Sequence, residues 1–151
     1  MDTKLAGKRI FITEDDSLNR VVYTMILKSS GAILEFDRWG RETINRLHTF
    51  NPDLIILDLM LRGDSGYHLF QEIKRLPQFA NVPIVAISAS DPSLSLPKCQ
   101  ELGFSGFIAK PIEEDLLVDH LLRLINGEQV WYVGERYGGE LINRSDQQAN
   151  E

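Results

Sequence analysis

Five side chains suited to holding a metal ion or a phosphoryl group stand where short apolar runs of the sequence end. Glu14 and Asp15 follow the first of these runs, and Asp58 follows a later one directly. Ser88 closes another run, and Lys110 comes after the last. Carboxylates gathered at one place repel one another unless a cation neutralises them, and an all-oxygen set suits a hard ion such as Mg²⁺. With Asp58 as nucleophile and a hydroxyl and an ammonium beside it, the set predicts a site that accepts a phosphoryl group as an acyl phosphate.

Each of these residues has a simpler explanation when it is taken singly. Asp58 could cap the following loop or helix, and Ser88 could cap the turn after its strand. Lys110 could be an ordinary surface lysine, and Asp16 could serve only the N-terminus of the helix that follows it. The joint pattern favours a phosphoryl-accepting site. A pair of acids, a single acid, a hydroxyl and a lysine follow one another along the chain, and each stands at the end of an apolar run.

The elements that must position these residues alternate between strands and helices. Asp58 ends the unbroken run LIIL, which is typical of a strand buried on both faces of a parallel sheet. The alternation predicts a doubly wound α/β fold: a flavodoxin-like, five-stranded parallel sheet of order 2-1-3-4-5 with helices on both faces. In that order the first and third strands are neighbours, which brings Glu14 and Asp15 close to Asp58. Strands are expected over 9–13, 32–36, 53–57, 83–88 and 105–109, and helices over 17–29, 40–50, 66–76, 93–102 and 113–126.

Helical periodicity predicts which faces of the helices are buried. Ser17 is the candidate N-cap of the helix over 17–29. Cys99, the single cysteine, falls on the apolar face of the helix over 93–102 and is expected to be a small core residue. In the first helix the apolar residues that recur at helical spacing, and are therefore expected to face the core, are Leu18, Val21, Val22, Met25 and Ile26.

Length and composition favour a soluble globular protein and exclude several classes. The 151 residues suit one domain, expected over 1–127, followed by a tail over 128–151 that carries no effector domain. A net charge of -6 disfavours binding to nucleic acid, and no run approaches the ~20 apolar residues of a membrane span. One cysteine excludes an internal disulfide and fits a cytoplasmic location. The three histidines show no ligand spacing, so no zinc site is expected.

The tail begins with an apolar stretch over 130–133 and ends in polar residues. We expect the stretch to pack back on the domain and the polar end to be disordered. The alternative is an aromatic patch, centred on Trp131 and Tyr132, for self-association or for a partner.

The sequence resembles the receiver domains of bacterial two-component response regulators, the CheY-like family, across residues 8–126. The resemblance rests on the stretches IFITEDD, LIILDLMLRGDSG, PIVAISAS and GFIAKPI. It implies that Asp58 accepts a phosphoryl group from a sensor histidine kinase or a histidine phosphotransfer protein. It also implies that Asp15, Asp58 and the backbone carbonyl of Met60 ligate Mg²⁺, with Glu14 helping through water. Ser88 and Lys110 would contact the phosphoryl group.

The same resemblance implies a switch. Phe107 matches the family's switch aromatic, which turns inward as the hydroxyl residue moves toward the phosphate, and the Lys110–Pro111 bond is often cis in this family. Three positions depart from the common pattern. Arg62 stands where the family usually has Pro, Ser88 replaces the commoner Thr and keeps the hydroxyl, and Phe107 replaces the frequent Tyr.

These features together predict a stand-alone response regulator receiver, a phosphoacceptor switch and not an enzyme, whose output is altered binding of a downstream protein. Many receivers pair as homodimers through the fourth helix, fifth strand and fifth helix, and this chain could do the same. Two other classes are open: a phosphatase of the haloacid dehalogenase type, and a scaffolding receiver that is never phosphorylated. A phosphatase of this type needs a second acid two residues after the nucleophile, where this chain has Met60. A scaffolding receiver usually lacks one of the site residues, whereas this chain has all of them. The chain could also be part of a larger hybrid protein.

Overall fold

Short apolar runs form a six-stranded parallel sheet in the computed structural model, which describes residues 3–40 and 42–141. The strand order is β2-β1-β3-β4-β5-β6, so the expected order of the first five strands is confirmed. Strands β3 and β4 are buried at every position, as a central strand covered on both faces must be. The strands are β1 (Arg9–Thr13), β2 (Ile33–Asp37), β3 (Leu54–Leu57), β4 (Ile84–Ser88), β5 (Gly106–Ala109) and β6 (Val130–Tyr132).

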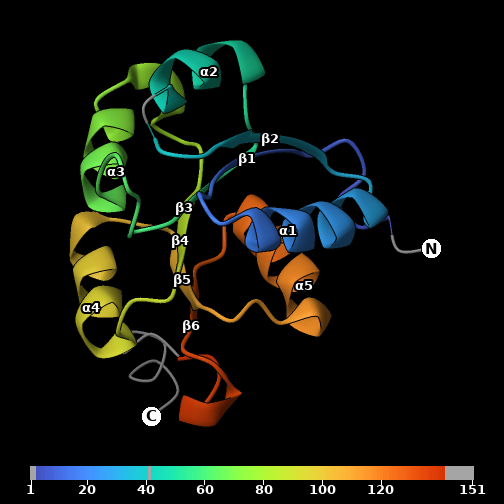
Figure 1. The fold of residues 1–151 in the computed structure, drawn as a ribbon, viewed down its shortest axis with the longest axis vertical. Helices are drawn as coiled ribbons and strands as arrows, with labels where there is room; N and C mark the ends of the chain where they lie inside the picture. The colour runs from blue at the N-terminus through green and yellow to red at the C-terminus, as the bar shows by residue number, and fades with distance from the viewer. Residues whose placement is uncertain (1–2, 41, 142–151) are drawn as a thin grey trace.

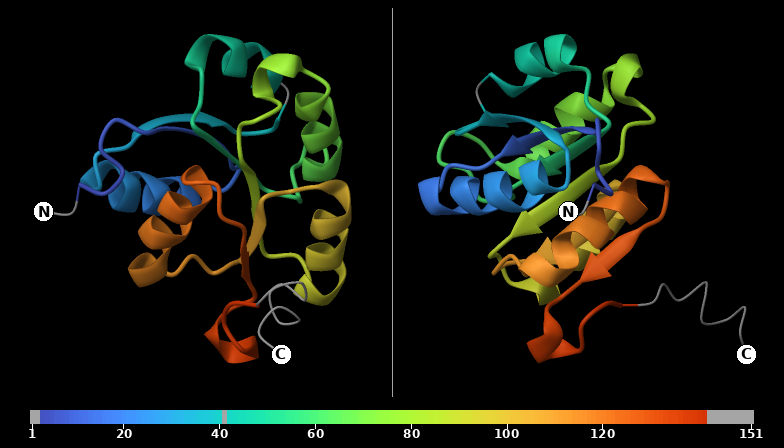
Figure 2. Two further views of the ribbon diagram at one scale, coloured as in Figure 1. Left: turned by 180° about the vertical axis from the view of Figure 1, so that it is seen from behind. Right: turned by 90° about the vertical axis from the view of Figure 1, so that its right-hand side faces the viewer.

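The helices cover both faces of this sheet (Figure 1). Helices α2, α3 and α4 lie on one face, and α1 and α5 on the other, an arrangement that the views of Figure 2 repeat. Two short 3-10 turns, η1 (Pro77–Phe79) and η2 (Glu135–Tyr137), complete the described elements. The helices are α1 (Ser17–Ser29), α2 (Thr43–Phe50), α3 (Gly66–Lys74), α4 (Pro92–Leu102) and α5 (Glu114–Ile125). Among the described residues, no helix is long and apolar enough to span a membrane.

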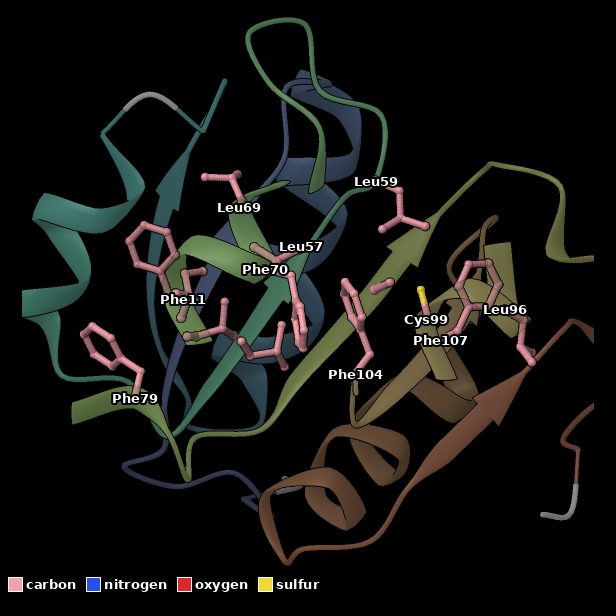
Figure 3. Packing of buried hydrophobic residues seen from close by; sticks show 14 of the residues in the cluster. Phe11, Leu57, Leu59, Leu69, Phe70, Phe79, Leu96, Cys99, Phe104 and Phe107 are labelled. Atoms are coloured by element: carbon pink, nitrogen blue, oxygen red, sulfur yellow. The ribbon is translucent and has the colours of Figure 1, made fainter. Parts of the chain in front are cut away.

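The buried side chains form two clusters, one on each face of the sheet. The cluster under α2, α3 and α4 contains many aromatic rings, including the stacked pair Phe70 and Phe104 (Figure 3). Cys99 is fully buried in it, which confirms the prediction of a small core residue. The cluster under α1 and α5 is largely aliphatic and includes Tyr23 and Tyr132.

The sixth strand corrects the five-stranded prediction. The tail does return to the domain, as expected, but Val130–Tyr132 pairs with β5 as a parallel edge strand and is buried at all three positions. A three-residue strand is too short to show a period, and only the exposed edge of β5 gives it a partner. The polar end of the chain, 142–151, lies outside the described residues.

Helix α1 corrects two further predictions. Its N-cap is Asp16 and not Ser17: the Asp16 carboxylate accepts hydrogen bonds from the amides of Leu18 and Asn19. Its fully buried residues are Tyr23 and Leu27, whereas three members of the predicted stripe are largely exposed, namely Leu18 at 74%, Val21 at 53% and Met25 at 67%. The buried face of α1 is displaced by about one residue from the predicted stripe. The prediction considered aliphatic residues only, whereas the Tyr23 ring supplies a large part of the buried surface.

Candidate phosphoryl and metal site

The parallel register places the acids together at one edge of the sheet. Thr13 pairs with Leu57 at the carboxyl ends of β1 and β3, so the next residues of the two strands, Glu14 and Asp58, lie side by side. Both side chains are almost fully buried. Asp58 is held by a hydrogen bond from its amide to the Thr13 hydroxyl oxygen, at 3.1 Å.

Lys110 bridges the two buried acids. Its Nζ donates to Oδ2 of Asp58 at 2.7 Å and to Oε1 of Glu14 at 2.6 Å. Burial alone would lower the pKa of Lys110, but the hydrogen bonds to Asp58 and Glu14 outweigh it and raise that pKa, so the ammonium stays charged. Burial raises the pKa of Glu14 even against the hydrogen bond from Lys110. A second cation beside Glu14 would offset this cost of keeping it ionised.

The other oxygen of Asp58 accepts two neutral hydrogen bonds. The Ser88 hydroxyl donates to Oδ1 at 3.1 Å, and the amide of Met60 donates to the same atom at 3.0 Å. The Ser88 hydroxyl oxygen in turn accepts from the Ser90 amide at 3.3 Å. Ser88 and Lys110 thus contact Asp58 from β4 and β5, and the Lys110–Pro111 bond is cis, as the resemblance implied.

The acids fit a hard divalent ion. Carboxylate oxygens of Glu14, Asp15 and Asp58 all lie within 4.8 Å of one another, which is an all-oxygen donor set of the kind that Mg²⁺ prefers. Arg62 lies in the loop that follows Asp58, at the position where the family usually has Pro. Its Nε lies 3.6 Å from Oδ2 of Asp15 and adds a positive charge at the entrance to the site. Met60 starts this loop with its side chain 63% exposed, and its carbonyl as a ligand stays a prediction.

Two of the predicted residues lie outside this constellation. Asp16 serves the helix N-terminus, as the simpler explanation held. Phe107 is fully buried in the apolar cluster with Leu96 and Cys99 of α4 (Figure 3). Its role as a switch residue stays a prediction.

Sequence reasoning missed three residues that shape the site. Thr13 positions Asp58, and its signal is a polar side chain closing an otherwise apolar strand. Tyr23 is 1% exposed, and its pKa is raised well above its usual value by burial and then by the charges of Glu14 and Asp58. Gly66, the first residue of α3, lies against the backbone of Asp58: an added Cβ would lie 2.3 Å from the Asp58 carbonyl oxygen.

A second group of metal-binding residue types lies on α3 and its preceding loop. Asp64, His68 and Glu72 are spaced four residues apart, and the His68 Nδ1 lies 2.9 Å from Asp64 while its Nε2 lies 3.5 Å from Glu72. These contacts join neighbours four residues apart, so ordinary local side-chain pairing accounts for the group. The expectation of no zinc site stays a prediction.

Several known proteins are similar to this chain in sequence. A family model described as the response regulator receiver domain matches residues 10–122. The chain is 26% identical over 147 residues to probable histidine kinase 5 of Oryza sativa subsp. japonica, an alignment that covers 82% of this chain but 12% of the kinase. It is 27% identical over 105 residues to the polar-differentiation response regulator DivK of Brucella ovis, covering 70% of this chain and 85% of DivK.

A solved receiver domain has a similar fold. The receiver domain of the sensor histidine kinase PA1611 from Pseudomonas aeruginosa PAO1 is 27% identical, with a TM-score of 0.72, over 81% of this chain and all of that domain. That structure holds a magnesium ion coordinated in its active-site cleft.

Proposed function

Since this chain belongs to the response regulator receiver domains, the phosphoryl-accepting modules of two-component signalling, we propose that its Asp58 carboxylate is the phosphoacceptor. One observation carries the proposal. Asp58 lies between the Ser88 hydroxyl at 3.1 Å and the Lys110 ammonium at 2.7 Å, with the oxygens of Glu14 and Asp15 within 4.8 Å. A nucleophile, two groups able to bind phosphoryl oxygens and a metal-binding pair therefore converge on one carboxylate.

The residues divide the reaction between them. An oxygen of Asp58 attacks the phosphorus of a phosphohistidine, the P–N bond breaks and an acyl phosphate forms, while the leaving imidazole takes up a proton. Lys110 and Ser88 then bind oxygens of the transferred group and compensate its charge. Mg²⁺, when held by Asp15, Asp58 and the Met60 carbonyl with help from Glu14, would neutralise the charge that develops on the phosphoryl oxygens. The chain catalyses only its own phosphorylation and dephosphorylation and acts as a switch.

The phosphodonor is a sensor histidine kinase or a histidine phosphotransfer protein, and α1 offers it a docking surface. Leu18, Val21 and Met25 are exposed on one side of this helix, which begins directly after the acids of the site. An apolar stripe beside the reacting carboxylate suits an apolar helix face of the donor. The output is altered binding of a downstream protein. Nucleic acid is an unfavourable partner for a chain of net charge -6.

The organisation of the whole protein is also part of the proposal. A receiver that acts alone, over 1–127 with the tail 128–151, has a parallel in DivK, of which the alignment covers 85%. The alternative, a receiver within a longer hybrid protein, has a parallel in the rice kinase, of which the alignment covers 12%. A cytoplasmic location stays a prediction from the cysteine count.

Incubation with Mg²⁺ and acetyl phosphate, followed by intact-mass measurement, tests the assignment. We expect one phosphoryl group on the wild-type chain, none without Mg²⁺ and none on Asp58→Asn. Asp64→Asn is the matched control, because it removes an aspartate from the same loop outside the constellation, and it should be labelled normally. Labelling of Asp58→Asn would refute the assignment. Sustained hydrolysis of a general phosphoester would revive the phosphatase, and a wild-type chain that binds no Mg²⁺ would revive the scaffold.

A further inference from the structure

The C-terminal segment, defined here as residues 128–141, covers the edge of β5. Its strand β6 pairs with β5 so that Trp131 lies opposite Phe107, and both side chains are buried, Trp131 at 4% exposure and Phe107 at 0%. The two rings belong to the same apolar cluster as Leu96 and Cys99 of α4, and Figure 3 shows Phe107 beside these two residues. Trp131 therefore occupies the position next to Phe107 at the edge of β5.

Specific contacts hold the C-terminal segment in place. The Leu141 amide donates to the Trp131 carbonyl at 2.7 Å, and the Val133 amide donates to the Gly139 carbonyl at 2.9 Å, so the chain folds back over the free edge of β6. Arg123 of α5 donates to both carboxylate oxygens of Glu140, at 2.6 and 2.8 Å. This bidentate pair fixes the segment to the body of the domain.

The segment also faces the loop that follows Ser88. A groove of about 720 Å³ separates the start of the β4–α4 loop, with Ala89 and Ser90, from Val133, Tyr137 and Leu141 of the segment. Lys110 lies on the same groove. A shift of the loop toward or away from Asp58 therefore changes the space that the segment borders.

The positions of Ser88 and Phe107 agree with each other. Ser88 lies within hydrogen-bond distance of Asp58, and the Phe107 side chain is fully buried. This pair of positions is the one that the resemblance associates with a phosphoryl group on Asp58. Because Trp131 packs beside Phe107, docking of β6 favours this same arrangement.

We infer that the C-terminal segment is a built-in clamp on the receiver, whose docking on β5 and a phosphoryl group on Asp58 favour the same buried position of Phe107 and so stabilise each other. The inference rests on the proposed function and adds its regulation. The edge of β5 is occupied by the chain's own β6. The expected homodimer through α4, β5 and α5 stays a prediction.

Two variants loosen the clamp without removing a core side chain. A Cβ at Gly106 would lie 2.3 Å from the Val130 carbonyl oxygen, so Gly106→Ala pushes β6 away from β5. Glu140→Gln weakens the pair with Arg123, whose two side chains are both partly exposed. Glu42→Gln is the matched control, because it weakens an ion pair with Arg46 on α2, far from β5.

Beryllofluoride with Mg²⁺, a stable stand-in for the acyl phosphate, serves as the probe. Its affinity is titrated by Trp131 fluorescence in a Trp39→Phe background, where Trp131 is the remaining tryptophan. We expect affinity to fall on the order of 10-fold in Gly106→Ala, by a smaller factor in Glu140→Gln, and not at all in Glu42→Gln. By reciprocity, beryllofluoride should slow amide hydrogen exchange in β6 of the wild-type chain.

The outcomes separate the two proposals. Equal beryllofluoride affinity in wild type, Gly106→Ala and Glu140→Gln, with β6 exchange unchanged by the probe, would overturn the clamp and leave the phosphoacceptor assignment intact. Tighter binding in the loosened variants would overturn it as well, since it would mean that the segment opposes phosphorylation. A wild-type chain that neither binds beryllofluoride nor takes up phosphate would overturn the proposed function and the clamp with it.

Discussion

Replacing Gly66 by alanine tests whether the close approach of α3 positions the phosphoacceptor. A Cβ at this position would lie 2.3 Å from the Asp58 carbonyl oxygen and 2.7 Å from the Leu59 Cα. Both are backbone atoms and cannot rotate away. Ordinary contact needs about 3.4 Å, so the start of α3 and the chain at Asp58 must separate by about 1 Å.

The size of the effect follows from this displacement. Overpacking costs about 1–3 kcal/mol, and the better helix propensity of alanine returns at most about 1 kcal/mol, so we expect a net loss of about 1–2 kcal/mol in the free energy of unfolding. The effect on chemistry is larger. A displacement of about 1 Å between reacting groups costs on the order of 100-fold in rate, and the acetyl phosphate labelling rate should fall accordingly.

Gly103→Ala is the control that separates stability from position. Gly103 has φ +100, so alanine there is strained by about 1 kcal/mol, but the nearest heavy atom, Phe70 Cζ, is 4.0 Å from the added Cβ and Asp58 is not disturbed. Urea unfolding gives the two stabilities, and intact-mass kinetics at saturating Mg²⁺ gives the two labelling rates. If Gly66→Ala were labelled at the wild-type rate, the close approach of α3 would not position the phosphoacceptor. If Gly103→Ala were slowed as much as Gly66→Ala, the loss of stability alone would explain the slower labelling.

Three further results are expected. Lys110→Met removes an ammonium that lies 2.6–2.7 Å from oxygens of Glu14 and Asp58. The variant should therefore bind Mg²⁺ several-fold more tightly while losing phosphorylation. Unchanged Mg²⁺ affinity in a calorimetric titration would contradict this. Burial lowers the pKa of His120 from its ordinary 6.5, although the charge of Glu140 acts in the opposite direction. The folded chain therefore favours the neutral imidazole, and the free energy of unfolding falls as the pH drops below 6.5 and the unfolded chain takes up a proton. Wild type should therefore lose more stability than His120→Gln between about pH 7.5 and 5.5 in urea unfolding, and parallel losses would be evidence against this account. Burial raises the pKa of Cys99 to about 12, so a thiol reagent should modify it only as fast as the fold opens; rapid modification of the native chain would disprove this burial.

The sheet and the site were predictable because they depend on local patterns. A strand covered on both faces needs an unbroken apolar run, and LIIL over Leu54–Leu57 is such a run. Parallel strands end at a common edge, so polar residues that directly follow such runs must gather there. Glu14, Asp58, Ser88 and Lys110 could therefore be placed together from the printed sequence, before any distance was known.

The face of α1 could not be decided in this way. Leu18, Val21 and Met25 satisfy the helical period as well as any buried stripe, yet they lie at the surface. Which of two neighbouring stripes is buried depends on what the sheet offers, and here Tyr23 and Leu27 fill that space. An amphipathic period shows that a helix has a preferred side, but only packing decides which residues are on it.

The sequence by itself determined the chemistry at the strand ends, because residue types and strand periodicity are local properties. Only the tertiary structure decided the close approach at Gly66 and the position of the C-terminal segment. Val130–Tyr132 becomes a strand because the edge of β5 is exposed beside it and Gly106 lets the two backbones approach. These contacts join residues distant in sequence, and their energy depends on shapes that form only when the whole sheet has assembled.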